Sequence, residues 1–487
     1  MLSAKFFVLI TIICSGFAFC SASRVFAGGI GFINGWWGGH RTDSIFRVGK
    51  CNDCDDREAV GPLGTVSIEK FVNRLVASKV SSFSVFPPLW SDGRRGSHCV
   101  ACHSDDPHVM PPFFRMPWRR VEGVGVGKAC DGLNKWDLSK FDPEYFDRLK
   151  QLAEALNAKG VKLIYSFYLH HNLVGKNASK QAHYVDFPWR PTNNINGVSM
   201  PLQIPAADDF FNISNNLTRA LHEKYFDHVI QSIGSLNNVI LMPAYEYTGD
   251  DRFLRFFVDQ LRKRGVPPDR IGIGAPKNII DTIFSDSKLM SDVGVVDLSY
   301  WWFKEDGSSF FPEGGKQISG RYIGSEYISP SSIYRQVSEI RRRFPAKLIF
   351  HQFPLDGDSI WAFLMAGGDI ALSYSEYPNN QLVTSDVMPT TQSLTREIQL
   401  KIQQLTLSTE TRFIPDAWNA DFAHAHSDKT EAYFFFSANK SMMIKLPEGR
   451  GILYDPRQNI IEPINQLGLR VGPERKGWML FVPKTRG

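Results

Sequence analysis

The sequence predicts an α/β protein, a (β/α)8 TIM barrel followed by a small β-sandwich. Short apolar segments rich in β-branched and aromatic residues alternate with amphipathic helical segments along most of the chain. Eight such strand-like segments precede residue 415, and a (β/α)8 barrel needs eight. The 487 residues exceed an ordinary domain of roughly 150 to 200 residues and suit one large barrel with an appendage.

The expected barrel strands can be placed from the apolar pattern. In chain order they are 31–37, 80–90, 161–171, 239–247, 270–277, 295–303, 347–353 and 369–377. One intervening helix begins with Asp142 as N-cap and Pro143 at its first position, and another spans about 331–343 with a basic last turn at 341–343. The loops after the second and third strands are long, and loops after strands form the active-site rim of this fold.

The pattern changes after about Pro415. Alternating strands and turns follow, as in 431–437 and 441–446, and this arrangement is typical of antiparallel β-structure. The sequence therefore predicts a barrel domain at 28–414, with cysteine-containing loop insertions, and a C-terminal β-sandwich at 415–487.

The N-terminus has the pattern of a signal peptide. Lys5 precedes the apolar run 6–13, and small residues near Ala27 suit signal-peptidase cleavage, so 1–27 is the expected signal. No later stretch offers the roughly 20 apolar residues of a membrane helix. We expect a secreted protein, extracellular or periplasmic, with no membrane contact after cleavage. The 55 basic and 50 acidic residues are spread along the chain, which argues against a nucleic-acid partner.

Five cysteines remain after the expected signal, all in one Gly-, Asp- and Pro-rich region: Cys51, Cys54, Cys99, Cys102 and Cys130. Disulfides that fasten long loops are one interpretation, since exported proteins use them often. The two Cys-x-x-Cys pairs also fit a zinc knuckle, and the second pair with His103 matches a haem-attachment pattern.

The apolar segment 239–245 ends on Glu246, which stands between two tyrosines. Catalysis on this fold occurs at the C-terminal ends of the strands, so this glutamate is a candidate acid, with a structural ion pair as the alternative. Rings at expected strand ends form a surface on which sugars can stack, although core packing would also explain them: Tyr245, Tyr247, Tyr300, Trp301 and Trp302.

Polar residues follow the third expected strand. His170 and His171 end it, and Asn193 and Asn194 lie in the next loop. Imidazoles and amides both donate and accept hydrogen bonds, which suits sugar hydroxyls, whereas loop capping is the structural alternative. Consecutive histidines on a strand point to opposite faces, so we expect no metal at the cleft and no cofactor.

Several stretches together resemble secreted clan-A glycoside hydrolases, nearest the apiosidase-like group: "KFDPEYFDRLKQLAEALNAKGVKLIYSF", "RPTNNING", "NNVILMPAYEYTGDD" and "AGGDIALSY". "GILYDPRQN" and "KGWMLFV" resemble the small β domain that follows the barrel in that group. The resemblance covers nearly the whole mature chain and implies a carbohydrate substrate. It also implies that Glu246 is the acid/base, although Tyr245 stands where that group usually has Asn.

The resemblance places a nucleophile at the end of the seventh strand, where this chain has Gln352, or His351 beside it. Three interpretations follow. A nearby carboxylate substitutes, with these candidates: Asp356, Asp358, Glu376 and Glu326. Alternatively the enzyme inverts through a more distant carboxylate. In the third, the barrel binds glycans without hydrolysis. A metal or haem protein built on the cysteine loops is a further alternative.

Overall fold

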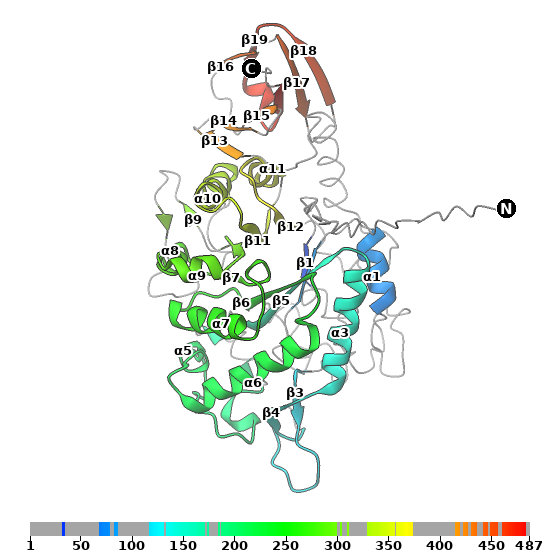
Figure 1. The fold of residues 1–487 in the computed structure, drawn as a ribbon, viewed down its shortest axis with the longest axis vertical. Helices are drawn as coiled ribbons and strands as arrows, with labels where there is room; N and C mark the ends of the chain where they lie inside the picture. Colours follow the sequence, from blue (N-terminus) through cyan, green and yellow to red (C-terminus); the bar gives the residue numbers. More distant parts are fainter. Residues whose placement is uncertain are drawn as a thin grey trace, which may run out of the picture.

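The computed structural model describes only part of the chain. The described residues are 32–34, 68–77, 82–85, 116–130, 133–170, 173–174, 184–185, 187–299, 302–303, 309–310, 329–355, 357–373, 414–418, 422–426, 430–435, 442–446, 449–455 and 460–483. They hold the coloured strands and helices of Figure 1. The expected signal peptide and four of the five cysteines that follow it, Cys51, Cys54, Cys99 and Cys102, lie outside them.

Two four-stranded parallel sheets form the centre of the molecule. The first has the order β1 (Phe32–Asn34), β2 (Ser82–Val85), β5 (Lys162–Leu169) and β6 (Val239–Tyr245). The second has the order β7 (Gly272–Gly274), β8 (Val295–Asp297), β11 (Leu348–Leu355) and β12 (Ile370–Ser373). Each of these strands overlaps one predicted segment, so the eight predicted barrel strands are confirmed as strands.

The two sheets are neighbours at one edge, because a parallel bridge joins Leu241, on β6, to Ile271, just before β7. At the other edge β12 and β1 come close together, but no strand pairing joins them within the described residues. The observed strand order is the order around a (β/α)8 barrel.

One face of these strands carries a small apolar cluster of its own. Its members come only from β5, β6, β8 and β11: Ile164, Ile240, Met242, Val295, Leu348 and Phe350. The opposite face joins the main core together with the helices. Because alternate residues of a strand point to opposite faces, the small cluster marks the inner side of the strands, and the strand residues between its members face the helices.

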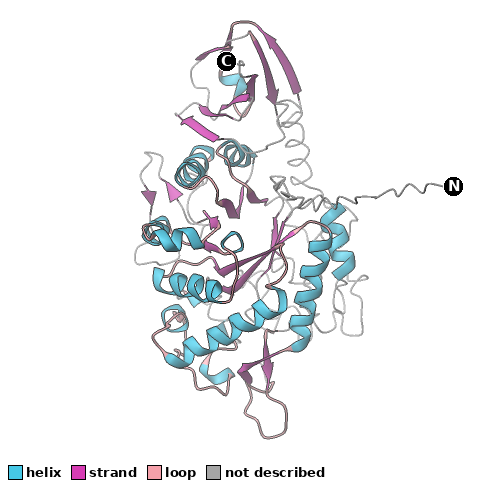
Figure 2. Ribbon diagram, viewed as in Figure 1, coloured by secondary structure: helices cyan, strands magenta, loops and turns pink. Residues whose placement is uncertain are grey.

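The helices lie around the strands of the two parallel sheets in Figure 2. They are α1 (Ile68–Ala77), α3 (Pro143–Ala158), α5 (Ala207–Phe210), α6 (Asn216–Ile233), α7 (Asp251–Lys263), α8 (Lys277–Phe284), α9 (Ser287–Asp292), α10 (Pro330–Arg343) and α11 (Gly357–Met365). The predicted start of α3 is confirmed: Asp142 Oδ1 accepts hydrogen bonds from the backbone N–H of Glu144 at 2.9 Å and of Tyr145 at 3.2 Å. None of the described helices is long and apolar enough to cross a membrane.

The predicted basic end of α10 is confirmed, but one of its arginines is deeply buried. Arg341 is 2% exposed and donates to Asp369 Oδ2 at 2.7 Å. It also donates to the backbone carbonyl of Gly367 at 2.6 Å and to that of Lys347 at 2.9 Å. Arg341 therefore ties α10 to the starts of β11 and β12.

The predicted sixth strand, 295–303, is too long. β8 ends at Asp297, because this side chain accepts a hydrogen bond from the backbone N–H of Ser299 at 3.0 Å and turns the chain. Trp302 lies instead in β9 (Trp302–Phe303), which pairs with β10 (Ser309–Phe310) in a separate antiparallel hairpin.

The loops after β2 and β5 join each other. The first contains the hairpin of β3 (Trp118–Arg120) and β4 (Trp136–Phe141), and the second contains the short helix η4 (Pro191–Asn193). The Trp136 carbonyl accepts from the N–H of Ile195 at 3.0 Å, and Asn196 Oδ1 accepts from the N–H of Leu138 at 2.7 Å. These bonds hold the two long loops together.

The C-terminal part is an antiparallel sheet of six strands with the order β13-β14-β15-β20-β17-β18. Its strands are β13 (Ile414–Trp418), β14 (Phe422–His426), β15 (Thr430–Phe435), β17 (Arg450–Asp455), β18 (Ile460–Asn465) and β20 (Met479–Pro483). Strands β16 (Met442–Lys445) and β19 (Gly468–Val471) pair with each other and share a separate apolar cluster with one face of this sheet.

The other face of the C-terminal sheet shares the main core, to which it contributes Phe434 and Phe481. Figure 1 shows this sheet beside α10 and α11. The Tyr334 hydroxyl on α10 donates to the His424 carbonyl on β14 at 2.7 Å. The sheet is therefore packed on the helical shell rather than joined to it only through the chain.

Candidate functional site

Glu246 directly follows the last residue of β6, so it stands at the C-terminal end of the fourth strand, as predicted. Its side chain is buried, at 7% exposed. Its backbone φ is 56°, in the left-handed region, and among the described residues no other non-glycine residue has a positive φ. This conformation is costly for a residue with a side chain, and such residues cluster at functional sites.

His170 lies beside Glu246 on the neighbouring strand. Leu169 pairs with Tyr245, and the N–H of His170 donates to the Tyr245 carbonyl at 3.0 Å. The His170 ring is 2% exposed and lies 5.1 Å from the Tyr247 ring and 5.3 Å from the Phe211 ring. Two of the predicted site residues, Glu246 and His170, are therefore brought together at the ends of adjacent strands.

Tyr247 closes the turn that follows Glu246. Its hydroxyl donates to the Asp250 carbonyl at 2.8 Å, and its ring lies directly over Gly249, where a Cβ atom would come within 2.6 Å of that hydroxyl oxygen. Tyr247 is 1% exposed, and burial raises the pKa of its hydroxyl well above the ordinary value. The hydroxyl therefore remains protonated and able to donate.

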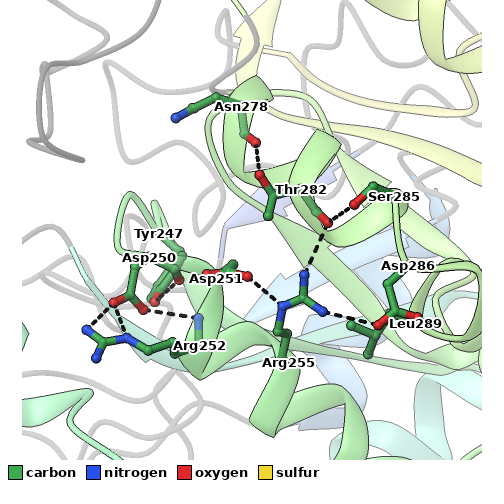
Figure 3. A network of polar contacts seen from close by, with 10 residues as sticks. All are labelled: Tyr247, Asp250, Asp251, Arg252, Arg255, Asn278, Thr282, Ser285, Asp286 and Leu289. Carbon is green, nitrogen blue, oxygen red and sulfur yellow. Dashed lines mark hydrogen bonds and ion pairs between the residues drawn. The ribbon is translucent and has the colours of Figure 1, made fainter.

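A polar network continues from this turn into three helices (Figure 3). Asp250 caps α7 and accepts from the Arg252 side chain at 2.6 Å. Arg255, one turn further along α7, pairs with Asp251 at 2.5 Å and with Asp286, the N-cap of α9, at 3.3 Å. Arg255 also donates to the Thr282 carbonyl on α8 at 3.1 Å. The turn after Glu246 is thus fastened to the packed helical layer.

Tyr245 is not on the inner side of β6. It stands three residues beyond Met242 of the inner cluster, so alternation puts its side chain on the helix side, where it is 3% exposed. The geometry thus favours the core-packing interpretation of Tyr245 over contact with a sugar.

Asn193 and Asn194 are buried, and loop backbone occupies their amides. Asn193 Nδ2 donates to the Val185 carbonyl at 2.7 Å and to the Phe187 carbonyl at 2.9 Å. Asn194 Nδ2 donates to the Arg190 carbonyl at 3.0 Å. Loop capping therefore explains both residues.

The seventh strand has an irregularity at the expected nucleophile position. His351 pairs with Ala371 on β12, but the next pair is Pro354 with Leu372, so Gln352 lies in a register shift of β11. His351 is 1% exposed and its ring lies 6.3 Å from that of Phe363. Such bulges are common beside active sites because they redirect side chains.

Several predicted residues have no described side chain. Gln352 and Trp302 are placed only as strand residues, and Asp358 only as a residue of α11. The other candidates lie outside the described residues: His171, Tyr300, Trp301, Glu326, Asp356 and Glu376. These remain predictions.

Asp297 is not among the residues that the sequence pattern predicts for the site. It is the last residue of β8, is 2% exposed, and accepts a hydrogen bond from the N–H of Ser299 as well as from its hydroxyl. The sequence feature that could reveal Asp297 is Asp-Leu-Ser at the end of an apolar strand. There an acidic residue interrupts the apolar run, just before the aromatic residues 300–302.

A cavity of about 660 Å³ lies between the β3–β4 hairpin and the start of α3. Arg119, Arg120, Trp136 and Glu144 are among its lining residues. The Arg120 guanidinium stacks on the Trp136 ring at 3.7 Å and donates to the Asn134 carbonyl at 2.6 Å. Both acidic and basic side chains line the cavity, so it favours neither sign of charge.

No group of His, Cys, Asp and Glu suited to a metal ion occurs within the described ranges. Cys130, the one cysteine inside them, is exposed, and the Arg190 guanidinium donates to its Sγ at 2.7 Å.

Solved structures similar to this chain include glycoside hydrolases. A presumptive glycoside hydrolase from Bacteroides vulgatus ATCC 8482 matches with a TM-score of 0.53 and 10% identity, over 94% of this chain and 83% of that one. A GH30 endoxylanase from Clostridium papyrosolvens C71 matches with a TM-score of 0.38 and 9% identity, over 86% and 94%. The Bacteroides match shows a shared α/β fold. No curated protein sequence matches the chain.

One protein-family model matches more than half of the chain. A model described as a domain of unknown function, DUF6298, matches residues 19–387. That span contains every strand of the two parallel sheets and ends before the C-terminal antiparallel sheet. The chain therefore belongs to the DUF6298 family.

Proposed function

We propose that this protein is a secreted glycoside hydrolase that cleaves a polysaccharide or oligosaccharide, with Glu246 as the acid that protonates the leaving oxygen. The observation that carries the proposal is the backbone of Glu246, which has a left-handed conformation at the C-terminal end of a central strand. Strain of this kind persists where the surroundings fix a residue for function. In this proposal the eight strands close into a barrel at 28–414 and the C-terminal sheet at 415–487 is a separate β-sandwich.

The surroundings of Glu246 support an acid at this place. Glu246 is 7% exposed, and the ring of its neighbour His170 packs against the Tyr247 and Phe211 rings. The network around Arg255 holds the turn after Glu246 in place, which suits a group that must meet a glycosidic oxygen within hydrogen-bonding distance.

A second candidate is a glycan-binding protein without hydrolytic activity. The observation that favours it is Gln352 at the expected nucleophile position, because an amide does not form the usual glycosyl ester. In this case the site binds sugar and releases no product.

Reducing-end release from plant, algal and bacterial polysaccharides tests the two candidates, using wild type and Glu246→Gln. This substitution is nearly isosteric and removes the proton donor. Glu144→Gln, at a half-buried residue of the first turn of α3, is the matched control. Hydrolysis by wild type and Glu144→Gln, with a loss of about 10²–10⁴-fold in Glu246→Gln, supports the acid assignment. Binding of a polysaccharide without product release by wild type supports the glycan-binding candidate.

A further inference from the structure

We propose that Asp297 is the second carboxylate of the site, acting as the base that activates water in a hydrolysis that inverts the anomeric configuration. This inference rests on the proposed function, since it assigns another residue to the same reaction. It differs from the expectation carried by the family resemblance, which places the second carboxylate at the end of the seventh strand. Here the residue ends the sixth strand, β8.

Asp297 faces the inner side of the strands. A Cβ atom on Gly272 would lie 2.1 Å from Met242 Sδ, a member of the inner cluster, so Gly272 is on the inner side of β7. Gly274 is two residues further along and shares that face. A Cβ atom on Gly274 would lie 2.8 Å from the Asp297 Cβ and 2.9 Å from its Oδ2. The carboxylate of Asp297 therefore lies over Gly274, on the inner side.

The carboxylate is directed from β8 toward β6, the strand that Glu246 directly follows. Ser299 donates to Oδ1 of Asp297, and Oδ2 occupies the space over Gly274 on the intervening strand β7. β7 offers no side chain at either inner position, since both are glycine. Met242 fills the space over Gly272, and the Asp297 carboxylate fills the space over Gly274.

The strand register gives the relative level of the two carboxylates. Asp297 pairs with Gly274, and the bridge of Leu241 with Ile271 places Ala244 level with Gly274. Glu246 stands two residues beyond Ala244, so Asp297 lies one inner position deeper. Two interstrand spacings of about 4.8 Å and an offset of about 6.6 Å along the strands put the backbones of the two residues roughly 12 Å apart. Side chains that converge from these strands suit the roughly 6.5 to 9.5 Å between the carboxyl groups of inverting enzymes.

The reaction balances with these two groups and water alone. Asp297 accepts a proton from water as the water oxygen bonds to the anomeric carbon. The bond from that carbon to the leaving oxygen breaks, and Glu246 gives its proton to the leaving oxygen. Asp297 ends protonated and Glu246 ionised, and proton exchange with solvent restores both. The products are two sugars, each with a new hydroxyl group.

The test uses 2,4-dinitrophenyl glycosides and the polysaccharide that wild type hydrolyses, with Glu246→Gln, Asp297→Asn and Asp292→Asn. Asp292, a buried aspartate at the end of α9 that pairs with Arg262 and Lys288, is the matched control. Dinitrophenolate leaves without a proton, so Glu246→Gln should keep most activity on the aryl glycoside and lose it on the polysaccharide. Asp297→Asn should lose about 10²–10⁴-fold on both.

Two further measurements distinguish a catalytic base at Asp297 from a residue that only stabilises the fold. Sodium azide should restore turnover of the aryl glycoside by Asp297→Ala and give a glycosyl azide, because the small anion replaces activated water. The first sugar released by wild type should have the inverted anomeric configuration by proton NMR. If the aspartate variants do not fold, Ser299→Ala should move the acidic limb of the kcat/KM pH profile to higher pH, because the carboxylate loses a donor.

If wild type hydrolyses the substrates and Asp297→Asn keeps activity within about threefold of wild type, the assignment of Asp297 as the base is overturned. The search for the second carboxylate then moves to the segment after the seventh strand. Retention of configuration would also overturn the assignment. Absence of hydrolysis by wild type on every substrate would instead overturn the proposed function, and the Asp297 assignment with it. The failures of the two proposals are therefore distinguishable.

Discussion

Asp297 occupies the space that a side chain on Gly274 would fill, with its Oδ2 atom 2.9 Å from the position of a Cβ on that glycine. Gly274→Ala should therefore displace the carboxylate. We expect a loss of about 1–3 kcal/mol of unfolding free energy, typical of overpacking in a filled core. Chemical denaturation checks this. Gly468→Ala is the control, since its Cβ would meet only the end of Met443, at 3.2 Å, and the Ile444 carbonyl, at 3.7 Å; equal losses in both variants would contradict the account.

Replacement of Glu246 by Asn should stabilise the fold relative to Glu246→Gln. Both substitutions remove the carboxylate, but Asn tolerates the left-handed conformation better than Gln does. We expect a difference of about 0.5–1 kcal/mol in unfolding free energy, in favour of Asn, since left-handed backbone costs roughly 1–2 kcal/mol in ordinary residues. Thermal unfolding of the two variants measures it, and a lower midpoint for Asn would argue against backbone strain at this position.

Arg341→Met should be strongly destabilising, because it leaves Asp369 buried without its 2.7 Å partner. Breaking a buried ion pair typically costs about 3–5 kcal/mol. Lys150→Met, which removes the exposed 3.9 Å pair with Glu154, should change stability by at most about 0.5 kcal/mol. Denaturant titration of both variants is the measurement, and similar small losses would show that Arg341 contributes little.

His222 should make the fold sensitive to acid. Its ring is fully buried between the Tyr168 hydroxyl, at 2.7 Å, and the Phe210 carbonyl, at 2.8 Å, and burial lowers its pKa to about 4. The unfolded chain binds this proton near pH 6.5, so between pH 6.5 and 4 only the unfolded state gains it. The neutral His222 ring contributes its full share of the unfolding free energy above pH 6.5. This contribution falls by about 3 kcal/mol as the pH drops to 4.

Unfolding free energies at pH 7 and pH 5 check the His222 prediction. His222→Gln keeps a donor toward Phe210 and does not titrate. It should be less stable than wild type at pH 7 but lose less between pH 7 and pH 5. Parallel losses in the two proteins would show that other groups cause the acid sensitivity.

The fold follows from the sequence where a local pattern determines it. The alternation of apolar segments predicts each strand of the parallel sheets, and Asp142 marks the start of α3 because an N-cap needs only neighbours three residues away. Arg341 shows the limit of local patterns. Its position in a basic last turn is predictable, but its burial depends on Gly367 and Asp369 on a distant segment.

The site is predictable to a smaller extent. Glu246 stands out because a carboxylate ends an apolar strand. Asp297 does not, because the rings that follow it extend the β-like pattern to residue 303, whereas the strand ends where the carboxylate bonds to Ser299. Asn193 and Asn194 suit both sugar contact and loop capping by composition, and only their backbone partners decide between the two.

The most direct test of the central claim compares hydrolysis and binding in one pair of proteins. Product release from the polysaccharide that wild type cleaves is measured for wild type and Glu246→Gln, and oligosaccharide binding by both is measured by calorimetry. The account predicts a loss of about 10²–10⁴-fold in hydrolysis with binding within a few-fold of wild type. Undiminished hydrolysis by Glu246→Gln would contradict it.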